Sequence, residues 1–170
     1  MPFFLEVFGV PSLLAIYALA AYAKKIHAEL LTDGLITGIW TGLVATVVYD
    51  GVRYVVEHLH PFGYSGFVPI YLYGSWITGL PRTSLAAAAA GWIYHYWNGA
   101  TFAVIYALSF GKRPWWWGLG YGIVMECCML GLFPFFLRVS NKLDFILISM
   151  IGHLAYGATL GHLTHKHLSA

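Results

Sequence analysis

Four ionisable side chains stand inside long apolar stretches of this sequence, at Asp50, His95, Glu126 and His153. Groups of this kind are costly to bury in an apolar medium unless they pair with one another or bind something. Two carboxylates and two imidazoles form a ligand set that suits iron, manganese or zinc. The sequence therefore predicts a metal centre in which Asp50 and Glu126 are anionic ligands and His95 and His153 are neutral ligands.

A b-type haem is an alternative occupant, with His95 and His153 as axial ligands from two separate helices. Gly99 and Gly157 each follow one of these histidines by four residues, so they share its helical face. A flat macrocycle could lie against such a face because it has no bulky side chain. Asn98 could donate a hydrogen bond to the bound group. The two carboxylates favour a metal ion over haem, since haem requires neither.

The histidines belong to a repeated pattern, because "HYWNGAT" begins at His95 and "HLAYGAT" begins at His153. Each follows an apolar stretch with a single acid, and Gly42 and Gly118 each stand eight residues before that acid. The chain therefore resembles two copies of one unit, in which a helix with a carboxylate precedes a helix with a histidine. Repeats in membrane proteins often place a binding site at their interface.

The composition predicts a membrane protein. Of the 170 residues, 59% are hydrophobic and only 9% are charged, whereas a soluble domain has about 25% charged residues. The net charge of +2 argues against a nucleic-acid partner. Five stretches have the length and apolar character of a membrane span. They cover Phe3–Ala23, Gly34–Val56, Ser84–Phe110, Trp116–Leu137 and Phe145–Leu163.

The expected fold is all-α: a single membrane domain of five transmembrane helices, with the internal repeat in spans two and three and spans four and five. The parts are residues 1–32 for the first span and a cytoplasmic loop, 33–60 and 84–111 for the first copy, and 114–165 for the second. Residues 61–83, uncharged up to Arg82 and rich in aromatic side chains, predict an interfacial or re-entrant loop on the outer side.

Basic residues near the span ends predict the orientation. The excess lies on the side of Lys24, Lys25, Lys112, Arg113 and Lys166. That side is expected to be cytoplasmic, with the N-terminus outside and the C-terminus inside a bacterial inner membrane.

The stretches "GWIYHYWNGATFAVIYAL", "WWWGLGYGIVM" and "GHLAYGATLGHL" resemble small bacterial inner-membrane proteins of unknown function, the YagU-like proteins. The resemblance covers residues 34–165, and its most specific elements are the two histidine-glycine helices. It implies a polytopic membrane fold and supplies no activity.

Three functions remain open at this point. The first is metal or haem binding for redox chemistry or electron transfer with a hydrophobic substrate. The second is a non-catalytic subunit of a larger membrane complex, or a homo-oligomer, in which the polar groups bond across helices and nothing is bound. In that case Asp50 could pair with Arg53, and His95 with Glu126. The third is a small transporter whose carboxylates relay protons.

Overall fold

The computed structural model describes residues 10–26, 28–60, 62–63, 65–137 and 142–169, with no side-chain description for residues 132–142. In these residues the chain is all-α, with six helices and no strand. The helices are α1 (Val10–Lys25), α2 (Glu29–Leu59), α3 (Val68–Thr78), α4 (Leu85–Phe110), α5 (Trp116–Leu137) and α6 (Lys142–Leu168). The all-α prediction is therefore confirmed. The part of the first predicted span before Val10 lies outside the described residues.

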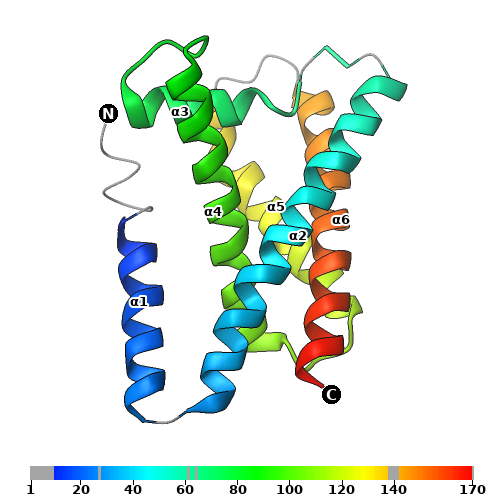
Figure 1. Ribbon diagram of the computed structural model, residues 1–170. Coiled ribbons are helices and arrows are strands. Elements are labelled where there is room, and N and C mark those ends of the chain that lie inside the picture. The colour runs from blue at the N-terminus through cyan, green and yellow to red at the C-terminus, as the bar shows by residue number, and fades with distance from the viewer. Residues whose placement is uncertain (1–9, 27, 61, 64, 138–141, 170) are drawn as a thin grey trace.

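Helix α2 is the centre of the bundle (Figure 1). It crosses between α4 and α6 and packs closely against both, whereas α5 lies mainly against α6 and α3 against α4. Helix α1 stands at the side and contacts chiefly α2. One hydrogen bond, from Trp97 Nε1 to Ser12 Oγ at 2.8 Å, also joins α1 to α4. Each half of the predicted repeat is thus a pair of packed helices, α2 with α4 and α5 with α6.

Small residues allow the two helices of each pair to approach closely. A methyl group added to Gly42 of α2 would lie 2.8 Å from the backbone of Ala100 and Gly99 on α4. A methyl group added to Gly118 of α5 would lie 2.7 Å from the Cα of Gly161 on α6. The equivalent glycines of the two predicted copies therefore occupy equivalent contacts.

The segment between α2 and α4 contains a helix where the sequence predicted an interfacial or re-entrant loop. Helix α3 begins with Pro69 in its first turn and ends at Gly79, whose φ of 72° lies in the left-handed region that favours glycine. With 11 residues it is too short to span a bilayer. It packs on the first half of α4, where the backbones meet at Gly74 and Gly91.

Two helices, Glu29–Leu59 and the described part of α6, Leu143–Leu168, are long and apolar enough to cross a membrane. About 44% of each apolar window is buried inside the bundle. These two helices are consistent with a membrane location. The bundle of five transmembrane helices stays a prediction.

Candidate functional site

Asp50 and the half-buried His95 form the first of two pairs between a carboxylate and an imidazole. Asp50 lies on α2 and is only 8% exposed. The Nε2 atom of His95, on α4, lies 3.0 Å and 3.1 Å from the two carboxylate oxygens of Asp50. Arg53, one turn further along α2, places Nη1 3.4 Å from Asp50 Oδ1 and is itself buried. The pairing of Asp50 with Arg53 is therefore confirmed.

Glu126 and His153 form the second pair, between α5 and α6. Glu126 is fully buried, and its Oε2 lies 2.8 Å from His153 Nδ1. The hydroxyl of Ser149 donates a hydrogen bond of 2.7 Å to the same oxygen. The other carboxylate oxygen, Oε1, is buried and makes no hydrogen bond. Because Glu126 is paired with His153 and His95 with Asp50, the expected bond between His95 and Glu126 is wrong.

Tyr49 lies between the two pairs. Its ring centroid is 5.9 Å from that of His95 and 5.1 Å from that of His153. Its side chain also lies close to Ser149, whose hydroxyl donates a hydrogen bond to Glu126. The guanidinium of Arg53 lies over the Tyr49 ring, 4.6 Å from the centroid. Tyr49 and its neighbours therefore connect the two pairs into one buried polar cluster.

The four residues predicted as metal ligands thus meet as two pairs. Within the described part of the chain, no group of three or more histidine, cysteine, aspartate or glutamate side chains is arranged to hold a metal ion. The four-ligand metal centre stays a prediction.

The two glycines predicted to face a haem lie against neighbouring helices. A methyl group on Gly99 would collide with Thr46 of α2, and one on Gly157 would collide with Gly118 of α5. A haem ligated by both histidines would have to displace these contacts and the ring of Tyr49. Asn98 lies near Tyr94, one turn earlier on α4.

Sequence reasoning missed Tyr49 and Ser149. Ser149 precedes His153 by four residues and therefore shares its helical face, which is a signal visible in the sequence. Tyr49 stands next to Asp50 and points in a different direction around α2. Nothing in its sequence position indicates that it touches both histidines.

A loop covers the cluster at the end where α2 finishes and α6 begins. Glu57 Oε1 accepts a hydrogen bond of 2.6 Å from the backbone N–H of Gly66. Asp144 Oδ2 accepts one of 2.6 Å from the backbone N–H of Gly63. The ring of Phe67 lies over the buried guanidinium of Arg53, with 4.8 Å between the ring centroid and Cζ. Two carboxylates therefore hold this loop in place over the polar interior.

No protein-family model matches the chain, and comparison with curated proteins and with solved structures finds no match. The resemblance to the YagU-like proteins accordingly stays a prediction.

Proposed function

We propose that this chain is an integral membrane protein whose interior holds a proton-relay centre, and that it works as a small transporter that conducts protons. The observation that carries the relay is the arrangement of two carboxylate–imidazole pairs on either side of Tyr49, each with a buried carboxylate. Ionisable groups buried within membrane helices commonly serve proton or ion pathways.

The distribution of side chains supports a membrane location. Asp50, Arg53 and Glu126 are buried at 8%, 4% and 0% exposure. Large apolar side chains face outward on five helices, among them Leu14 at 62%, Ile93 at 72% and Val124, Leu147 and Val47. A water-soluble protein has the opposite distribution, with its charged groups on the surface. In a bilayer these outward-facing apolar side chains contact lipid tails instead of water, so their exposure carries no free-energy cost.

The orientation follows from the basic residues. Lys24 and Lys25 end α1, Lys112 and Arg113 lie in the turn between α4 and α5, and Lys166 lies in the last turn of α6. These three places lie at the same end of the bundle (Figure 1). We assign that end to the cytoplasm of a bacterial inner membrane, with the N-terminus outside.

The charge balance of the cluster favours one transferable proton. The two carboxylates carry two negative charges, and Arg53 neutralises one of them. With both imidazoles neutral, one negative charge remains in a poorly hydrated interior, which is unfavourable. One proton on either His95 or His153 makes the cluster neutral. The proton then has two possible positions, and histidine is the side chain best suited to exchange it near neutral pH.

The side chains of Tyr49 and Ser149 lie between the two positions. The Tyr49 ring contacts both imidazoles, and the nearby Ser149 hydroxyl donates a hydrogen bond to Glu126. Small rotations of these hydroxyls can pass a proton from one pair toward the other. In a transporter, occupancy of one pair or the other would accompany the change of access from one side of the membrane to the other.

Proton flux into vesicles tests this proposal. The purified chain is reconstituted in liposomes that contain a pH-sensitive dye, and a potassium diffusion potential drives protons inward. We expect the wild type to acidify the lumen at least about a hundredfold faster than Glu126→Gln, because a positioned acid–base group contributes a factor of this size. Cys127→Ser is the matched control, since Cys127 adjoins Glu126 on α5 but is exposed.

Equal rates for the wild type, Glu126→Gln and protein-free liposomes would refute the relay. Flux from the isolated chain would also argue against the alternative in which the protein is a non-catalytic subunit of a larger complex.

A bound metal ion is the second candidate, and the unpartnered Oε1 of Glu126 favours it. A cation beside this oxygen would satisfy a buried acceptor that otherwise has no partner. Metal analysis of the purified wild type beside the His95→Ala/His153→Ala double variant separates the two candidates. Stoichiometric iron, manganese or zinc that is lost in the variant would replace the relay by a metal centre. An optical spectrum of the same samples would reveal haem by its Soret band.

A further inference from the structure

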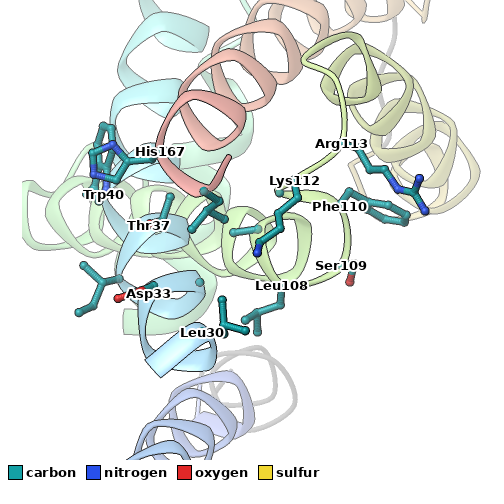
Figure 2. Close-up of a pocket in the computed structure, with 15 residues that line it drawn as sticks. Leu30, Asp33, Thr37, Trp40, Leu108, Ser109, Phe110, Lys112, Arg113 and His167 are labelled. Atoms are coloured by element: carbon teal, nitrogen blue, oxygen red, sulfur yellow. The ribbon is translucent and has the colours of Figure 1, made fainter. Parts of the chain in front are cut away.

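A groove of about 630 Å³ opens at the end of the bundle that we assign to the cytoplasm. It lies between the first turns of α2, the last turn of α4 with the turn that follows, and the end of α6 (Figure 2). The buried pairs lie further along the helices, and none of their four residues lines the groove. The groove is therefore separate from the candidate site.

Basic side chains line this groove on two sides (Figure 2). Lys112 and Arg113, in the turn after α4, and His167, at the end of α6, line it together with a single acid, Asp33. Figure 2 shows Lys112 extending across the groove. Arg113 lies over the ring of Trp117, 5.5 Å from its centroid, which holds this charge at the rim. The groove therefore carries an excess of positive charge.

The remaining wall is apolar and exposed. Leu30, Ile36 and Leu108 line it with exposed fractions of 72%, 59% and 37%. Trp40 lines it too, and its ring packs edge-on against His167 at 5.1 Å. A soluble anion would gain nothing from such a wall. A ligand with a phosphate head and hydrocarbon chains complements both parts.

We propose that this groove binds an anionic phospholipid, with the headgroup phosphate near Lys112 and the acyl chains along Leu30, Ile36 and Leu108. Basic pockets between helices on the cytoplasmic side are the usual sites for anionic lipid headgroups. Asp33 can accept a hydrogen bond from a hydroxyl of the headgroup. The proposal rests on the membrane location proposed above but not on the proton relay.

Fluorescence quenching of Trp40 tests the site. The chain is reconstituted in phosphatidylcholine with increasing amounts of dibrominated phosphatidylglycerol or dibrominated phosphatidylcholine. The quenching of Trp40 itself is the difference in quenching between the wild type and the Trp40→Phe variant. We expect half-maximal quenching at a mole fraction about tenfold lower for phosphatidylglycerol than for phosphatidylcholine. The two basic groups responsible are Lys112 and Arg113, which each contribute about fivefold at most.

Single substitutions identify the charges responsible. Lys112→Gln should raise the half-maximal mole fraction of phosphatidylglycerol about fivefold, and Lys112→Arg should preserve the wild-type value. Lys166→Gln is the matched control, because Lys166 adjoins His167 in the last turn of α6 but does not line the groove. Glu126→Gln should bind phosphatidylglycerol as the wild type does. Lipid binding and the proton relay can therefore fail independently.

Equal quenching by the two brominated lipids would overturn the proposal, as would equal effects of Lys112→Gln and Lys166→Gln. Protection of Trp40 from both lipids would overturn it too. In that case protein, such as a second copy of the chain, would cover the groove.

Discussion

The close contact between α5 and α6 predicts that Gly118→Ala damages the second buried pair from two turns away. A Cβ at residue 118 would lie 2.7 Å from the Cα of Gly161, and it would also collide with the carbonyl oxygen of Gly157. Ordinary contact begins at 3.4 Å. Both groups belong to the backbone, so no side chain can rotate away. The helices must separate by about 0.7 Å or more to reach ordinary contact.

This separation has a cost that can be compared with a matched substitution. Gly120→Ala, two residues further along α5, adds the same methyl group where nothing lies within 4 Å. Both variants gain the same helix propensity from alanine, so their difference isolates the collision. Overpacking costs about 1–3 kcal/mol. For a chain of this length the difference corresponds to about 2–12 °C in the midpoint of thermal unfolding.

Thermal unfolding in detergent, followed by intrinsic tryptophan fluorescence, measures the difference. Gly118→Ala should unfold at the lower temperature, while Gly120→Ala should match or exceed the wild type. Proton flux should also fall in Gly118→Ala, because a shift of α5 lengthens the 2.8 Å contact between Glu126 and His153. Equal unfolding temperatures for the two variants would refute the helix contact on which this reasoning depends.

Three further substitutions test the interior. Tyr156→Phe removes the 2.6 Å hydrogen bond that α6 donates to the carbonyl of Gly99 on α4 and should lower the free energy of unfolding by about 1–2 kcal/mol in chemical denaturation. Arg53→Met leaves the buried carboxylate of Asp50 without its cation and should cost about 3–5 kcal/mol by the same measurement. Glu57→Ala frees the loop before α3, and hydrogen exchange of that loop should accelerate about tenfold. Wild-type values would contradict the corresponding contacts.

The helices were largely predictable because each is a long apolar stretch with clear ends. The predicted segments Ser84–Phe110 and Trp116–Leu137 correspond almost residue for residue to α4 and α5. Helix α3 was missed because its 11 residues are too few for a span and glycine interrupts them at Gly74. That glycine is the point where α3 meets the backbone of α4 at Ala87. A sequence alone does not say which helix such a glycine will face.

The residues of the candidate site were predictable as a set, but their partners were not. Isolated charges in apolar stretches indicate that Asp50 and Glu126 must be paired. Which imidazole each carboxylate meets depends on how the helices are rotated about their axes. In α2, Asp50 faces α4, while the adjacent Tyr49 faces α6, where it lies against Gly152. A helix that packs on two neighbours buries side chains on two of its faces. Hydrophobic periodicity does not say which face meets which neighbour.

The two pairs share a plan but differ in their surroundings, and this difference bears on the proposed relay. Asp50 has Arg53 beside it, whereas Glu126 has the neutral Ser149 and an unpartnered oxygen. Because Arg53 already compensates Asp50, the uncompensated negative charge lies on Glu126. An imidazolium at His153 would compensate that charge from 2.8 Å, the distance between His153 Nδ1 and Glu126 Oε2. An imidazolium at His95 would compensate it only from the other side of Tyr49. In the proposed relay, the resting proton would therefore belong to the pair between α5 and α6, and the pair between α2 and α4 would be the position that it reaches in transfer. A relay with two identical pairs would have no such preference, so the asymmetry of the two copies gives the proposed centre a direction.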